Sequence, residues 1–92
     1  MYRVVVREEV KAEIETISKY TREEWGELQE QLLKGYIRAT IELLATFPHT
    51  GVRSNRVGVF VKAVQHVPFV IVYELGDHVL IIAQVLHVKR SR

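Results

Sequence analysis

Residues 68–92 have the sequence PFVIVYELGDHVLIIAQVLHVKRSR, and this stretch decides the fold. Two strongly apolar runs flank Gly76-Asp77, which predicts a β-hairpin closed by a tight two-residue turn. With Leu75 paired to His78, the alternation of a strand divides the side chains between two faces. The face suited to a core holds Phe69, Ile71, Tyr73, Leu75, Leu80, Ile82, Leu86 and Val88. The opposite face holds Val70, Val72, Glu74, Val79, Ile81, Ala83, Val85 and His87.

The second face of the hairpin carries more apolar surface than one layer of helices can cover. Five of its residues would face water: Val70, Val72, Val79, Ile81 and Val85. Soluble monomers rarely expose a contiguous apolar patch above about 300–600 Å². We therefore predict a partner-binding surface there. Two alternatives are that the long hairpin curls over itself and that the protein dimerises through this face.

The first half of the chain predicts one strand and two helices. Tyr2–Val6 is β-branched and predicts a strand, whereas helical spacing of apolar residues begins at Glu8 and continues to Tyr20. Thr21 to Glu24 match a capping box, which predicts that a second helix starts at Thr21 and ends before Pro48. A regular apolar stripe along it comprises Trp25, Leu28, Leu32, Tyr36, Ala39 or Thr40, Leu43 and Phe47.

The remaining segments complete an α+β domain. His49–Gly58 is polar and predicts a loop, Val59–Val64 predicts a strand, and Gln65–Pro68 links it to the hairpin. The order β-α-α-β-β-β predicts a helical hairpin on one face of a small sheet, in which the last three strands form an antiparallel meander. We expect residues 1–92 to form a single domain.

Composition narrows the possible functions. The sequence contains no cysteine, which excludes disulfides and thiolate chemistry, and its four histidines lack metal-ligand spacing, so we expect neither metal nor cofactor. No apolar run approaches the roughly 20 residues of a membrane span and no signal-peptide pattern is present, so a cytoplasmic protein is the simplest interpretation. Residues 47–92 carry six Lys/Arg against two Asp/Glu, so positive charge gathers in the strand-rich half, where an acidic partner would be attracted.

In the order of its motifs, the chain resembles the ParE/RelE superfamily of bacterial toxins from type II toxin–antitoxin pairs. The resemblance rests on YRVVV at the start, on ELLATFPHTGVR and PFVIVYEL, and on the final VLHVKR. The Phe-Pro-x-x-Gly and Val-Leu-His-x-x-Arg segments are most similar to the ParE branch. This resemblance implies a toxin that a cognate antitoxin holds inactive. ParE-like members act on DNA gyrase, whereas RelE-like members cut messenger RNA on the ribosome.

The residues of the RelE pattern are only partly present. RNA cleavage needs groups that activate the 2′-hydroxyl and stabilise the phosphate charge. Lys62 and Arg90 match basic positions of that pattern, and His87 stands where some nuclease members have a general acid or base. Val70 occupies the position of the third-strand arginine, and a valine cannot contact a phosphate.

We therefore expect a ParE-like toxin that binds gyrase without chemistry of its own. An mRNA interferase that uses Lys62, His87 and Arg90 is the alternative, and a non-toxic interaction module is the third possibility. Basic candidates for contacting the target are Arg53, Arg56, Lys89, Arg90 and Arg92, although the last three could equally be a solubilising tail. Candidates for antitoxin binding are Val70, Val72, Val79, Ile81 and Val85.

Overall fold

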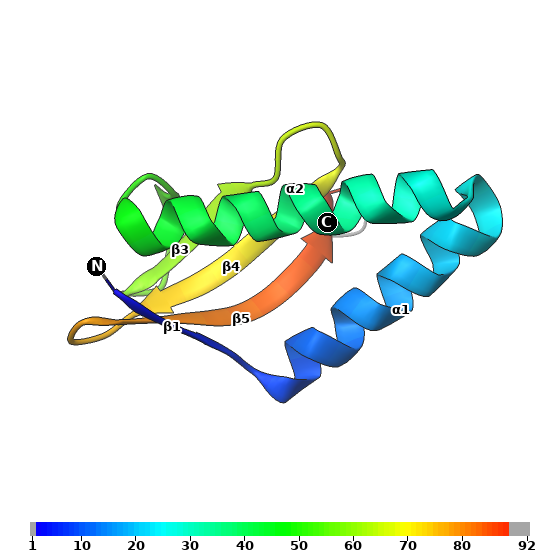
Figure 1. Ribbon diagram of the computed structural model, residues 1–92. Helices are drawn as coiled ribbons and strands as arrows, with labels where there is room; N and C mark the ends of the chain where they lie inside the picture. The colour runs from blue at the N-terminus through cyan, green and yellow to red at the C-terminus, as the bar shows by residue number, and fades with distance from the viewer. Residues whose placement is uncertain (1, 89–92) are drawn as a thin grey trace.

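One five-stranded sheet and a helical hairpin form the protein in a computed structural model that describes residues 2–88 (Figure 1). The elements are β1 (Arg3–Val6), α1 (Glu8–Trp25), α2 (Glu27–Thr46), β2 (Val52–Arg53), β3 (Val59–Ala63), β4 (Phe69–Leu75) and β5 (Val79–His87). The strand order is β1-β5-β4-β3-β2, with β1 parallel to β5 and every other pair antiparallel. The predicted α+β class and element order are confirmed, and the predicted 49–58 loop also contains the short strand β2.

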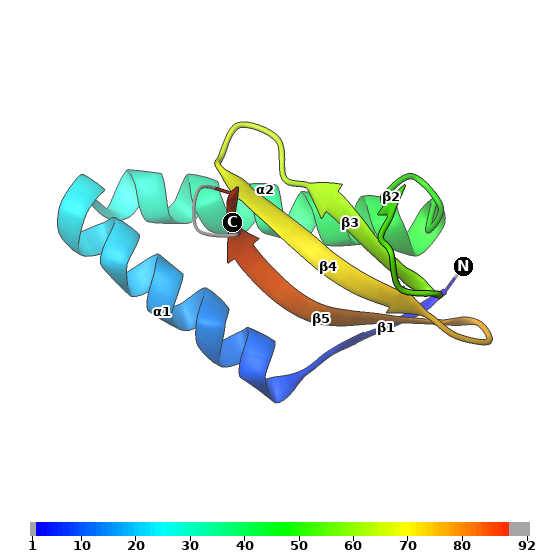
Figure 2. The ribbon, with the colours of Figure 1, turned by 180° about the vertical axis from the view of Figure 1, so that it is seen from behind.

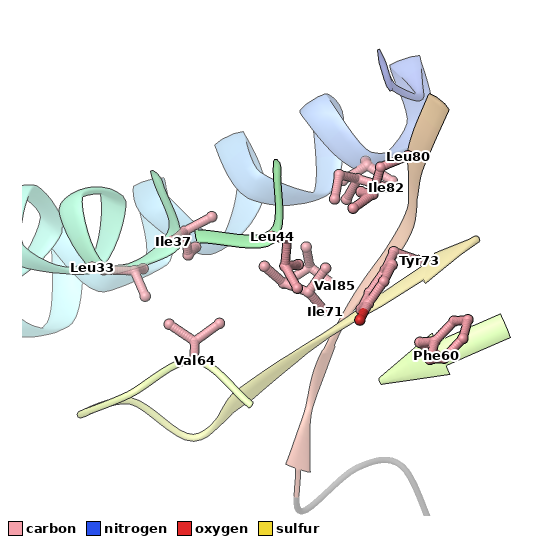
Figure 3. Close-up of a cluster of buried hydrophobic side chains, with 11 residues drawn as sticks. Leu33, Ile37, Leu44, Phe60, Val64, Ile71, Tyr73, Leu80, Ile82 and Val85 are labelled. Carbon is pink, nitrogen blue, oxygen red and sulfur yellow. The ribbon is translucent and has the colours of Figure 1, made fainter. Parts of the chain in front are cut away.

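The helices lie on one side of the sheet, and the view from behind shows the other side of the strands without a helix over it (Figure 2). The core between the layers is apolar and includes Tyr73, Leu44, Ile71, Leu80 and Ile82, all fully buried (Figure 3). Burial of each such side chain stabilises the fold by about 1.5–3 kcal/mol. The prediction that the face with Ile71, Tyr73, Leu80 and Ile82 packs under the helices is confirmed up to Ile82.

The turn of the hairpin is shifted by one residue from its predicted position. Leu75 pairs with Leu80 instead of His78, and the Gly76 N–H donates to the Val79 carbonyl at 2.9 Å. Asp77 and His78 therefore occupy the turn, and His78 adopts the positive φ of 58° that a tight turn requires. The turn moves by one residue, but the partner of Leu75 moves by two, from His78 to Leu80. Residues two apart on a strand share a face, so Leu75 and Leu80 still lie on the same face, as predicted.

A bulge in β5 overturns the prediction for the last part of the hairpin. Val72 pairs with Gln84 but Tyr73 pairs with Ile82, so Ala83 is an extra residue and the alternation of β5 reverses beyond it. Val85, predicted to face a partner, is only 4% exposed and belongs to the core. Leu86, predicted to be core, pairs with Val70 on the open face, and Val88, also predicted to be core, is exposed. The one sign of the shift in the sequence is Gln84, a polar residue that strict alternation would place in the core and that the bulge leaves exposed.

The boundary between the helices also differs from the prediction. α1 continues through Thr21, whose hydroxyl donates to the Ile17 carbonyl at 2.8 Å instead of capping a new helix. The break falls at Gly26, with φ 94° and ψ 169°, a backbone conformation that is almost restricted to glycine. On α2 the buried residues include Leu33, Ile37, Thr40 and Leu44. The more regular apolar stripe predicted from Trp25 to Phe47 lies on the neighbouring side of α2. Its side chains Leu28, Leu32, Leu43 and Phe47 are exposed.

Candidate protein-binding groove

A groove of about 940 Å³ opens between α1, the start of α2, the start of β4 and the end of β5. α1 and α2 meet at the turn at Gly26 and spread apart toward the sheet, and the end of β5 appears in the opening between them in the ribbon view (Figure 1). Most of the lining is apolar. It includes Ile17, Tyr20, Trp25, Leu33, Val67, Phe69, Val85 and Leu86.

Two aromatic side chains on α1 stand open to solvent at this groove. Tyr20 is 60% exposed and Trp25 is 71% exposed. Rings of this kind offer a large apolar area together with one polar group, and they are enriched at the energetic centres of protein interfaces. The groove is therefore better suited to a protein partner than to a small polar ligand.

The geometry of β5 explains why the groove exists. β1 pairs only with Val79–Ile82 of β5, so the outer edge of β5 beyond Ile82 has no strand beside it among residues 2–88. α1 lies along this edge, and the Val85 N–H donates to the Glu13 carboxylate at 3.3 Å. Glu9 and Glu13 give this side of the groove a negative character. Sequence analysis missed these residues because the groove depends on the bulge and on the short pairing of β1.

The open face of the sheet holds four of the five predicted antitoxin-binding residues. Val70, Val72, Val79 and Ile81 are each half-buried. Arg7 and Glu74 form an ion pair of 3.4 Å on this face, beside a polar hollow of about 330 Å³ that is also lined by Arg56 and Gln84. The face is thus a mixture of apolar and charged residues, and Val85 is absent from it because of the bulge.

The predicted basic residues do not form one patch. Arg53 pairs with Phe60 and shares its face, the one toward the helices, whereas Arg56 lines the hollow on the open face. Both are exposed. Lys89, Arg90 and Arg92 lie outside the described residues.

The predicted nuclease residues are not brought together either. Lys62 lies on β3 opposite Ile71, and His87 lies on β5 opposite Phe69, so β4 separates them. Two strand spacings amount to about 10 Å. The His87 ring packs edge-on against Phe69, with 5.1 Å between ring centroids. Within residues 2–88 no group of three or more His, Asp or Glu residues could hold a metal ion.

Tyr73 is a positioning residue that the sequence did not reveal. Its buried hydroxyl donates to the Pro48 carbonyl at 2.7 Å and accepts from the Gly51 N–H at 3.0 Å. A side chain at Gly51 would overlap the Tyr73 ring, so only glycine fits there. Burial raises the pKa of Tyr73 above its ordinary value of 10.0, and the Gly51 hydrogen bond opposes this effect. The Phe-Pro-x-x-Gly segment is thus fixed to β4 through one hydroxyl.

Comparisons with known proteins identify a structure with the same fold and the family to which the chain belongs. The structure is similar to one described as the chromosomal ParDE toxin–antitoxin system from P. aeruginosa, with a TM-score of 0.84 and 16% sequence identity over 96% of this chain and 97% of that chain. At this identity the similarity shows a shared fold. Residues 4–92 match the family model of the ParE toxin of the type II toxin–antitoxin system parDE. The chain belongs to the ParE toxin family.

A search of curated proteins found no match. None of the helices between residues 2 and 88 has both the length and the apolar character needed to cross a membrane.

Proposed function

We propose that this ParE-family chain arrests growth by binding DNA gyrase in the cytoplasm, and that an antitoxin neutralises it by placing an amphipathic helix in the groove beside α1. The observation that carries the proposal is the apolar groove with its exposed Tyr20 and Trp25. An amphipathic helix in an apolar groove is a recurrent mode of recognition, with anchors at positions i, i+3 or i+4, and i+7.

The dimensions of the groove support a helical ligand. The residues of α1 that line it run from Glu9 to Trp25, which corresponds to about 24 Å of helix. An antitoxin helix of roughly four turns would match this length. Because Glu9 and Glu13 lie near one end, we expect a Lys or Arg of the antitoxin at that end.

Two sets of variants separate the groove from the open face of the sheet. Trp25→Ala and Tyr20→Ala should weaken binding of the protein encoded by the adjacent reading frame at least tenfold, measured by calorimetry, because both rings are exposed and suited to anchoring a partner. Val72→Glu and Ile81→Glu test the open face, where a charge would be buried under any bound apolar segment. Val57, fully exposed in the 49–58 loop, provides a control as Val57→Glu. Unchanged affinity in both groove variants would refute the proposed site.

Binding to gyrase is supported by the family and by the separation of Lys62 from His87. The experiment measures inhibition of gyrase supercoiling and ribosome-dependent cleavage of mRNA with the same purified protein. We expect inhibition of supercoiling without cleavage. Cleavage that disappears in Lys62→Ala and His87→Ala, with supercoiling unaffected, would instead assign the chain to the mRNA interferases.

Single substitutions can then show which of the exposed basic residues contacts gyrase. Arg53→Ala and Arg56→Ala alter opposite faces of the sheet, so the variant with the weaker inhibition identifies the face that contacts gyrase. Normal folding together with an absence of growth arrest on expression would indicate the non-toxic interaction module.

A further inference from the structure

The turn between α1 and α2 projects beyond the sheet, so the strands give the second half of α1 little support. Both ribbon views show the helices meeting at Gly26 away from the strands (Figure 1 and Figure 2). The α1 carboxylate that bonds to β5 is Glu13, in the first half of the helix. The two buried residues of α1 are Val10 and Ser18, and the serine, in the second half, buries little apolar area. The position of residues 17–25, which form one wall of the groove, therefore depends on contacts with α2.

Four charged side chains join this half of the hairpin across the two helices. Glu30 of α2 accepts a hydrogen bond from Arg22 of α1 at 3.4 Å and pairs with Lys34 at 3.5 Å. Lys34 also lies 4.0 Å from the carboxylate of Glu15 on α1. We call these four residues the interhelical network. The network lies outside the lining of the groove, so it can influence a ligand there only by placing the helices.

Glu30 is the residue on which the interhelical network depends. Its side chain is only 10% exposed, whereas those of Arg22 and Lys34 are 49% and 39% exposed. A carboxylate buried to this degree has lost most of its hydration and needs its cations close by. Ion pairs between exposed side chains, such as Lys11 and Glu8 within α1, contribute little. Burial therefore distinguishes the interhelical network from an ordinary surface pair.

Gly26 lets the angle between the two helices change. It has φ 94° and ψ 169°, and a Cβ atom added there would meet no heavy atom of the described residues within 4 Å. Hinges are short connections of this kind, in which a few residues absorb the change in φ and ψ. Arg22 and Glu30 each lie one helical turn from Gly26, on opposite sides of it. Their ion pair thus spans the hinge.

We propose that the interhelical network holds α1 at the angle that forms the groove, and that Glu30 is a positioning residue for the antitoxin from outside the groove. The inference rests on the proposed function of the groove and adds the means by which the toxin sets the width of that groove. Without the Glu30 charge, Arg22 and Lys34 repel each other and hydrate separately. The second half of α1 then moves about Gly26, and the ring of Trp25 leaves the position at which it would contact a ligand.

Hydrogen exchange of the free toxin tests the interhelical network without any partner. Glu30→Gln keeps the shape of the side chain and removes its charge, so the amides of residues 17–25 should exchange about threefold faster or more, while those of β4 keep their protection. Glu8→Gln is the matched control, because it makes the same change of net charge but removes an ion pair that lies within α1. Equal exchange of residues 17–25 in Glu30→Gln and in the parent would overturn the proposal.

Salt provides an independent check that the effect is electrostatic. Raising the ionic strength from about 0.1 M to 1 M shortens the Debye length from about 10 Å to 3 Å. Because Arg22 and Lys34 are about half exposed, salt should speed exchange of residues 17–25 in the parent and have less effect in Glu30→Gln. The same response to salt in both proteins would contradict an electrostatic contact across the hinge.

Affinity for the protein encoded by the adjacent reading frame tests the positioning role. In calorimetry, Glu30→Gln should bind about threefold more weakly or worse, and Glu8→Gln should bind as tightly as the parent. If Glu30 acts by placing Trp25, its substitution should matter much less in the Trp25→Ala background, so the two effects should not multiply. Full multiplication of the two effects, or unchanged affinity of Glu30→Gln, would overturn the positioning role.

The groove and the interhelical network can fail separately. Unchanged affinity in both Trp25→Ala and Tyr20→Ala would refute the groove as the antitoxin site and with it the positioning role of Glu30, even where exchange shows that the network fixes α1. Weaker binding in those two variants, with normal affinity and normal exchange in Glu30→Gln, would keep the groove and refute the network.

Discussion

At the scale of single residues, the hydroxyl of Tyr73 holds the loop between α2 and β2 against the sheet. Tyr73→Phe removes both of its hydrogen bonds and leaves the Pro48 carbonyl and the Gly51 N–H without this partner. Such a loss at a buried site costs about 1–3 kcal/mol, which urea unfolding at neutral pH would measure. Tyr20→Phe, in which the ring is exposed, is the matched control and should change stability by less than about 0.5 kcal/mol.

The raised pKa of Tyr73 makes the same residue a source of alkaline sensitivity. The folded protein holds the phenol proton more tightly than the unfolded chain, because burial disfavours the phenolate. Its contribution to stability is therefore complete below the unfolded pKa of 10.0 and is lost as the pH rises through the folded pKa. The stability difference between the parent and Tyr73→Phe should be constant below pH 10 and should shrink as the pH rises above 10 toward the raised pKa of the folded protein. A difference that stays constant above pH 10 as well would contradict the assignment.

At the scale of elements, two glycines of the helical hairpin should respond to the same substitution in opposite ways. Gly26 has a positive φ of 94° between the helices, so Gly26→Ala should destabilise the protein by about 1–3 kcal/mol. Gly35 is helical with open space around it, so Gly35→Ala should stabilise the protein by about 1 kcal/mol. Thermal unfolding of both variants tests the pair. Destabilisation by Gly35→Ala would show that open space at this position was the wrong inference.

The elements also show how far the sequence predicts this structure. Strand and helix identities follow from apolar period, and the strand pairing followed from the Gly76-Asp77 signal even though the turn itself lies at Asp77-His78. The bulge at Ala83 was missed although one residue indicates it, because strict alternation would have placed Gln84 in the core between Ile82 and Leu86, and the bulge leaves it exposed on the open face. The burial of α2 was ambiguous as well, since two adjacent stripes have helical spacing and the buried one, with Leu33, Ile37 and Leu44, is not the more regular of the two.

At the scale of the whole molecule, the candidate site arises from features far apart in the sequence. The bulge brings Val85 into the core, the short β1 leaves the edge of β5 to α1, and α1 contributes the exposed rings of Tyr20 and Trp25. The sequence predicted an apolar partner surface on the sheet, and residues such as Val72 and Ile81 remain candidates there. It could not predict the groove, because no local pattern encodes how α1 and β5 lie together.

This architecture predicts that the antitoxin stabilises the toxin through the groove without the toxin needing it to fold. A partner that binds only the folded state, at 100 times its dissociation constant, adds about 2.7 kcal/mol to the free energy of unfolding. For a domain of 92 residues this corresponds to a rise in Tm of roughly 10–20 °C. Trp25→Ala should leave the Tm of the free toxin within about 2 °C, because the ring is exposed, but should remove most of the rise at the same antitoxin concentration. A full rise in Trp25→Ala would show that the antitoxin stabilises the fold from another surface, and the open face of the sheet with Val72 and Ile81 would then be its site.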